Sequence, residues 1–164
     1  MPRVRYSFMN KDITSLPTDY QLQRRIGFRL TKLAKTIQSR LEDDILEHGL
    51  TRLKWCVLSG VALEGIKAPS DLADHIGVAR PAISRLLKTM ETEGLLERSL
   101  RAEDGRGRQI TVTELGKARM RSCWPFMGSN EDHFMAKLTQ EQAQSLSDIL
   151  DTLLEGEDAK LDTL

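Results

Sequence analysis

One stretch of the sequence gathers hydrogen-bonding and basic side chains on a single helical face. Pro81, Ser84, Arg85 and Lys88 share that face, Arg80 stands just ahead of them, and the apolar residues Ile83, Leu86, Leu87 and Met90 lie opposite. Arginine pairs bidentately with guanine in the major groove, serine bonds several groups, and lysine binds phosphate. The outward face has the chemistry of a DNA-recognition helix, and an ordinary charged surface helix is the competing interpretation.

A second basic group follows in residues 95–113. Residues 95–100 and 108–113 have the pattern of two short strands, and the polar segment 101–107 between them contains two glycines, as a hairpin tip requires. The tip and its flanks carry Arg98, Arg101, Arg106 and Arg108 against Glu103 and Asp104. An extended hairpin inserts an arginine such as Arg106 into the narrow minor groove, and Asp104 is placed to accept a hydrogen bond from it. Helix and hairpin together predict a winged helix-turn-helix, with a generic polar hairpin as the alternative.

The elements that must position these residues follow from apolar periodicity and capping residues. A long helix is expected over 20–47, a buried one over 51–63 capped by Thr51, and a short one over 71–76 capped by Ser70. The recognition helix follows over 81–93. A fifth helix runs to about residue 138 and is expected to kink or break near Pro125 and Gly128, and Thr139 opens the last helix with a capping box.

The first and last helices carry more apolar surface than one small lobe can cover. Their stripes run from Leu22 to Ile45 and from Leu146 to Leu154. The sequence therefore predicts a mainly α protein: a winged helix-turn-helix lobe with a two-stranded β-wing over 51–116, and dimerisation helices over 19–50 and 117–164. Residues 1–18 are interpreted as an N-terminal arm.

Composition limits the function more through charge distribution than through net charge. The 164 residues carry a formal net charge of +0, but the amino-terminal part is basic and the carboxyl-terminal part acidic. No signal peptide, membrane span or catalytic motif is recognisable, so we expect a cytoplasmic protein that is not an enzyme. His48, His75 and His133 are too far apart for metal-ligand spacing, and neither a metal nor another cofactor is expected.

Several motifs in this order resemble the MarR family of bacterial regulators. They are Leu50-Thr51, Asp71-Leu72-Ala73, Ala82-Ile83-Ser84-Arg85-Leu86, Glu93-Gly94-Leu95-Leu96-Glu97-Arg98, Asp104-Gly105-Arg106-Gly107 and Thr113-Glu114-Leu115-Gly116. The resemblance implies a triangular homodimer that binds palindromic operators in double-stranded DNA, usually as a repressor. It matches Arg106 to the wing arginine, Asp104 to its partner, and Ser84 and Arg85 to recognition-helix positions. Arg80 and Pro125 depart from the pattern.

An effector pocket is a further expectation. Family relatives often respond to small aromatic acids or related amphipathic anions. Aromatic and basic residues that would suit such a ligand are Arg25, Phe28, Arg29, Trp55, Trp124 and Phe126. The competing interpretation is that the aromatic rings fill the core.

Two other functions remain open from the sequence. Cys123 lies near Arg121, whose charge would lower its pKa, so a redox-responsive regulator of the same fold is one alternative. A winged-helix module that mediates protein contacts without binding DNA is the other, and the arginines on both the helix and the wing disfavour it.

Overall fold

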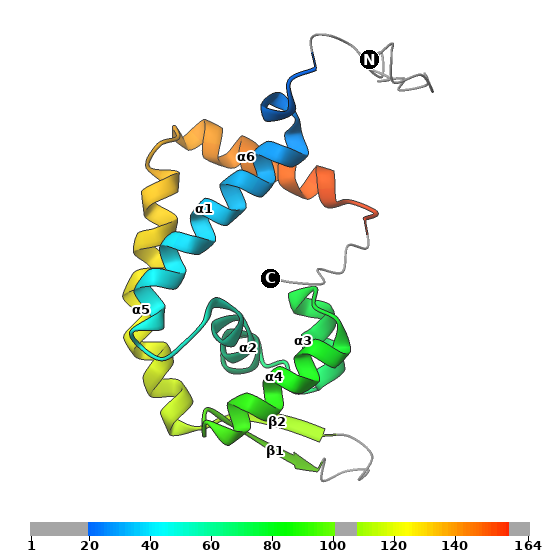
Figure 1. Ribbon diagram of the computed structural model, residues 1–164, viewed down its shortest axis with the longest axis vertical. Coiled ribbons are helices and arrows are strands. Elements are labelled where there is room, and N and C mark those ends of the chain that lie inside the picture. Colours follow the sequence, from blue (N-terminus) through cyan, green and yellow to red (C-terminus); the bar gives the residue numbers. More distant parts are fainter. Residues whose placement is uncertain (1–19, 101–107, 158–164) are drawn as a thin grey trace. The chain divides into compact units, whose positions relative to one another are not determined.

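The computed structural model describes residues 20–100 and 108–157 (Figure 1). By the clustering of its contacts, the chain divides into two compact units between Thr36 and Ile37. The predicted N-terminal arm, residues 1–18, and the hairpin tip, including Arg101, Asp104 and Arg106, lie outside the described residues. None of the described helices is both long enough and apolar enough to cross a membrane.

The first unit holds the short 3-10 helix η2 (Leu22–Arg24) and the start of α1 (Ile26–Leu46). The sequence predicted one continuous helix from Tyr20. Arg25 instead has an extended backbone, with φ −71° and ψ 136°, and it separates η2 from α1. Its guanidinium lies 4.7 Å from the ring centroid of Tyr20, a cation–π contact outside the helix.

The second unit has the predicted winged helix-turn-helix order. After the end of α1 come α2 (Arg52–Ala62), α3 (Pro69–Ile76), α4 (Arg80–Thr92), β1 (Leu96–Leu100), β2 (Arg108–Val112), α5 (Glu114–Met135) and α6 (Gln140–Leu154). The predicted fold class, mainly helical with a two-stranded wing, is confirmed. The strands pair antiparallel with Leu96 opposite Val112 and Arg98 opposite Ile110.

Local capping explains where most of these helices begin. The Thr51 hydroxyl accepts from the Lys54 amide, and Thr139 forms the predicted capping box with Gln142. The prediction of Ser70 as a cap was wrong. The helix α3 begins at Pro69 after Ala68, since proline has no amide hydrogen to satisfy at the first helical position and its φ is already helical.

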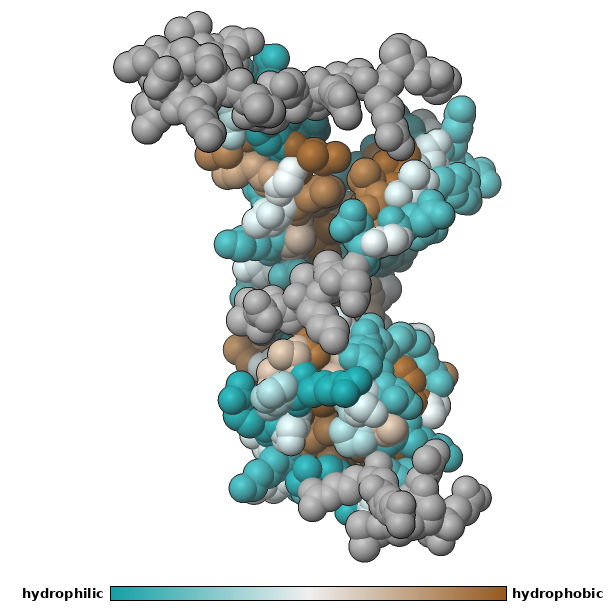
Figure 2. All heavy atoms as spheres, turned by 90° about the vertical axis from the view of Figure 1, so that its right-hand side faces the viewer, coloured by the Kyte–Doolittle hydropathy of each residue, from teal (hydrophilic) through white to brown (hydrophobic). Residues whose placement is uncertain are grey.

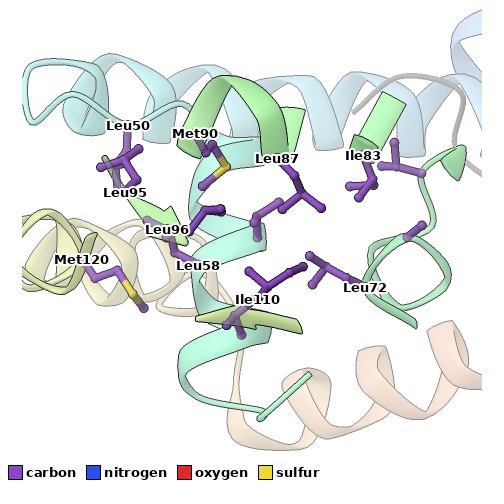
Figure 3. Close-up of a cluster of buried hydrophobic side chains, with 14 of the residues drawn as sticks. Leu50, Leu58, Leu72, Ile83, Leu87, Met90, Leu95, Leu96, Ile110 and Met120 are labelled. Atoms are coloured by element: carbon purple, nitrogen blue, oxygen red, sulfur yellow. The ribbon is translucent and has the colours of Figure 1, made fainter. Parts of the chain in front are cut away.

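The core of the second unit lies beneath α4 and the wing. Figure 3 shows Leu58 of α2, Leu72 of α3, Leu87 of α4 and Ile110 of β2 converging on one cluster. Each of these side chains is at most 1% exposed. Burial of a leucine or isoleucine side chain stabilises a fold by about 1.5–3 kcal/mol, so this cluster fixes the orientation of α4.

Of the kink or break predicted near Pro125 and Gly128, the break does not occur. The helix α5 is continuous from Glu114 to Met135. A proline inside a helix costs about 3 kcal/mol or more, because it removes a hydrogen bond and crowds the preceding turn. Tertiary packing on both sides of Pro125 offsets that cost: Met120 and Cys123 are buried before it, and Asn130 after it donates to the Ile37 carbonyl at 3.3 Å.

Candidate nucleic-acid interface

The two faces of α4 differ as the sequence predicted. Ile83, Leu87 and Met90 are at most 1% exposed, while Leu86 is half-buried. The predicted outward side chains, Pro81, Ser84, Arg85 and Lys88, are all exposed. Because the inner face is held in the core, the outer face is presented as one fixed surface.

Arg85 and Lys88 are the free cations of this surface. Among the described residues, no carboxylate lies within ion-pair distance of either side chain. Their backbone carbonyls accept hydrogen bonds from the Thr89 and Thr92 hydroxyls, and these bonds do not involve the charged ends of the two side chains. Both cations are therefore available to a polyanion.

Arg80 differs from its two neighbours. It is the first residue of α4, and its guanidinium donates to the Asp74 carboxylate of α3 at 3.0 Å. The side chains are 65% and 48% exposed, so the pair contributes little to stability. The pair also places the negative charge of Asp74 beside the predicted DNA-binding face.

Arg98 lies in a more protected pair. Its Nε donates to Oε2 of Glu91 at 2.8 Å, and its Nη2 contacts the same oxygen. The Arg98 side chain is 13% exposed. The pair joins β1 to the last turn of α4, which suits a role in holding the wing against the helix. Arg108 lies in β2, and its side chain is outside the described residues.

The base of the wing is closed by one threonine and one glycine. The Thr113 hydroxyl donates to the Gly94 carbonyl at 2.6 Å and accepts from the Gly116 amide at 3.1 Å. A Cβ at Gly116 would overlap the carbonyl oxygen of Leu95 and lie 2.7 Å from Cγ1 of Val112. Only glycine permits this close packing of α5 on the wing.

Within the second unit, the predicted effector residues make two ring contacts. Trp55 and Trp124 lie together, with ring centroids 6.0 Å apart, whereas Phe126 packs on His48 at 5.0 Å. Arg25, Phe28 and Arg29 belong to the first unit. The structure also has a groove between α2 and α5. Of its lining residues, the sequence predicted Trp124 alone; the full set is Ala62, Leu63, Lys117, Met120, Arg121 and Trp124.

Both cysteines lie in environments that oppose thiolate formation. Burial raises the pKa of the Cys56 thiol, and it also raises the pKa of Cys123, which is 0% exposed. The nearby guanidinium of Arg119 lowers the pKa of Cys123 less than burial raises it. A reactive cysteine needs the opposite balance.

The apolar face of α6 is open in the single chain. Its large apolar side chains are between 37% and 62% exposed: Leu146, Ile149, Leu150, Leu153 and Leu154. Figure 2 shows apolar side chains lying uncovered on the molecular surface. Contiguous apolar surface of this kind marks an interaction site in soluble proteins.

Comparisons with known proteins agree with this architecture. Residues 48–107 match the sequence model of the MarR family. A crystal structure of a cysteine-to-serine mutant of MarR from E. coli with operator DNA has a TM-score of 0.74 and 21% identity, covering 82% of this chain and 99% of that chain.

Two further structures are similar. MepR of S. aureus, in complex with DNA, has a TM-score of 0.75 and 17% identity, covering 81% of this chain and 98% of that chain. PcaV of Streptomyces coelicolor, in complex with its natural ligand, has a TM-score of 0.75 and 17% identity, covering 85% of this chain and 99% of that chain. At these identities the structures establish a shared fold.

Proposed function

Because residues 48–107 match the sequence model of the MarR family, we propose that this chain is a homodimeric transcriptional regulator of that family that binds palindromic operators in duplex DNA. The observation that carries the proposal is the outer face of α4. There, Arg85 and Lys88 are exposed and have no carboxylate partner among the described residues, while the opposite face is fixed in the core. Arg85 reads a base edge and Lys88 binds a phosphate.

The wing completes the interface in this proposal. Arg106 enters the minor groove and Asp104 holds it extended, while Arg108 contacts the backbone from β2. Arg98, paired with Glu91, orients the wing on α4. Arg80 and Ser84, at the start of the same face, and Pro81 beside them complete the proposed contact surface.

The homodimer is supported by the exposed apolar face of α6. In the proposal, segments 19–50 and 117–164 dimerise and segment 51–116 binds DNA. Two recognition helices related by a two-fold axis meet half-sites about one helical turn apart, which is why the operator is a palindrome. With the operator covered, the regulator acts as a repressor.

A small aromatic or amphipathic anion releases the proposed repressor from DNA. The similarity to PcaV, which was solved in complex with its natural ligand, supports a ligand-responsive regulator. A redox trigger at Cys123 is disfavoured, because the thiol is buried and its pKa is raised.

The test of DNA binding is selection of fragments from a random duplex library, followed by titration of the selected site at fixed salt. We expect Arg85→Ala to weaken binding by about 1–3 kcal/mol and to relax preference at one base position. Arg40→Ala, which removes an exposed arginine of α1 outside the lobe, is the matched control. Equal operator affinity of the wild type and Arg85→Ala would refute the recognition role.

A further inference from the structure

The end of α4 carries two acidic residues at a position that is electrostatically unfavourable for them. Glu91 lies in the last turn of the helix, and Glu93 is its C-cap. The aligned peptide dipoles make the C-terminal end of a helix negative, so carboxylates there are repelled. At about 100° per residue, the two side chains point to nearly opposite sides of the helix axis. They are therefore stabilised at this end only when cations from two neighbouring elements pair with them.

Each of these carboxylates is paired with a cation from a different element. The Lys54 ammonium of α2 donates to both carboxylate oxygens of Glu93, at 2.7 Å each. The Arg98 guanidinium of β1 donates to the Glu91 carboxylate. The two cations are 17% and 13% exposed, so salt screens these pairs less than it screens the pair of Arg80, which is 65% exposed. The end of α4 is thus held from α2 and from the wing at once.

Lys54 extends from an element that is itself fixed in the second unit. The Thr51 hydroxyl caps α2 by accepting a hydrogen bond from the Lys54 amide at 3.3 Å. Farther along the same helix, Val57 and Leu58 are 0% exposed and belong to the core. A cation that extends from an anchored helix restrains the position of its carboxylate partner. The pair with Glu93 therefore restrains the end of α4 relative to the core.

We propose that Lys54 is a positioning residue for base recognition, because its pair with Glu93 fixes the angle at which α4 presents Arg85. Arg85 precedes Glu93 by eight residues, which corresponds to roughly 12 Å along a helix. Over this length, a tilt of about 10° at the held end moves Arg85 by about 2 Å. This inference rests on the proposed function, in which Arg85 reads a base edge.

A displacement of this size affects base readout and phosphate binding differently. Hydrogen bonds to a base edge need donor–acceptor distances of about 2.7–3.2 Å, so a displaced Arg85 loses its bidentate contact. Lys88 has a flexible stem and can follow a phosphate over the same distance, and phosphate contacts carry no sequence information. Loss of the Lys54–Glu93 pair therefore lowers the preference for operator over random duplex, with little change in binding to random duplex.

Anisotropy titrations of the full-length protein with the selected operator and with random duplex of equal length, at one salt concentration, measure this preference. We expect Lys54→Gln and Glu93→Gln to lower the ratio of the two affinities by about tenfold, as the loss of one good base contact does. The two variants change the net charge in opposite directions, so a common loss is not a net-charge effect. Lys54→Arg keeps a donor for Glu93 and should keep most of the preference. Lys117→Gln removes another Lys–Glu hydrogen bond of 2.7 Å, to Glu114 within α5, and should leave the ratio unchanged.

A double-variant cycle distinguishes positioning from a general loss of structure. Since Lys54 acts through Arg85, Arg85→Gln should lower the ratio, and Lys54→Gln added to it should lower the ratio no further. An additive loss in the double variant, an unchanged ratio in Lys54→Gln, or equal weakening on both duplexes overturns the positioning role. An unchanged ratio in Arg85→Gln refutes the recognition role of Arg85 itself, and the inference with it. Circular dichroism checks that each variant is folded, and Glu93→Gln carries the test if Lys54→Gln is not.

Discussion

The helices α4 and α6 have similar patterns of apolar and polar residues, but the surroundings of their apolar faces differ. Both are amphipathic, with 13 and 15 residues. In α4 the apolar residues Ile83, Leu87 and Met90 are covered by the chain itself, and the charged face is exposed. In α6 the apolar face is exposed as well, with Leu150 at 37% and Leu154 at 62%. One helix is complete within its chain and presents charge, whereas the other needs an apolar partner.

The largest difference between the two helices should be seen in stability. Leu87→Ala removes a side chain that is 1% exposed, and we expect a loss of about 2–5 kcal/mol in the free energy of unfolding. Denaturant titration followed by circular dichroism measures it. A loss below 1 kcal/mol would show that α4 is not anchored in the core as the structure indicates.

The matching change in α6 should depend on concentration. Leu150→Ala should have little effect on stability in dilute solution and a growing effect as the protein is concentrated, because in the proposed homodimer this residue is buried at the interface. Leu150→Asp should prevent dimerisation and lower operator affinity while leaving the winged lobe folded. Light scattering and circular dichroism separate these effects, and a stable dimer of Leu150→Asp would contradict the assignment of α6.

A smaller effect is expected at the Arg80–Asp74 pair. Asp74→Asn removes the negative charge beside α4 and frees the Arg80 guanidinium, whose partner lies at 3.0 Å. Stability should change by less than about 1 kcal/mol, because the pair is exposed. Affinity for DNA should rise. The slope of log affinity against log salt concentration should become steeper, by the amount that corresponds to about one more released counterion. An unchanged salt slope, measured by anisotropy from low to moderate salt, would place Arg80 outside the interface.

The smallest expected effect is a change in the pKa of His133, caused by a neighbouring charge. The positive charge of Arg40 is the main reason that the pKa of His133 is lowered, with desolvation and the Lys137 charge contributing less. The Lys137 ammonium is 3.3 Å from Nε2 of His133. Arg40→Gln should therefore raise the pKa of His133 toward its ordinary value in an NMR titration, and the distant Arg85→Gln should not. Equal titration in wild type and Arg40→Gln would exclude this interaction.

Features that depend on neighbouring residues were predictable from the sequence. The caps at Thr51 and Thr139, the hairpin and the buried face of α4 follow from spacings within one or two turns. The cap predicted at Ser70 was wrong because Pro69 competes for the same helix start, and its lack of an amide hydrogen favours the earlier position.

Features that depend on contacts between distant segments were not predictable. The continuity of α5 through Pro125 requires packing around Met120 and Asn130 that no local pattern shows. Within the candidate interface, the sequence identified Arg80, Arg85 and Arg98 as DNA-binding candidates, without separating paired from unpaired side chains. Only the structure distinguishes them, since Arg80 and Arg98 have carboxylate partners and Arg85 has none among the described residues.

The single hydroxyl of Thr113 has a consequence for engineering the protein. It bonds the Gly94 carbonyl, at the end of α4, and the Gly116 amide, at the start of α5, so the two ends of the wing are joined at its base. The closure there does not depend on the length of chain that connects β1 to β2. Loop closure entropy rises only slowly with length, by about 0.6 kcal/mol for each doubling. A fluorescent or affinity tag inserted in the hairpin should therefore leave the lobe folded, and new chain termini placed there should do the same.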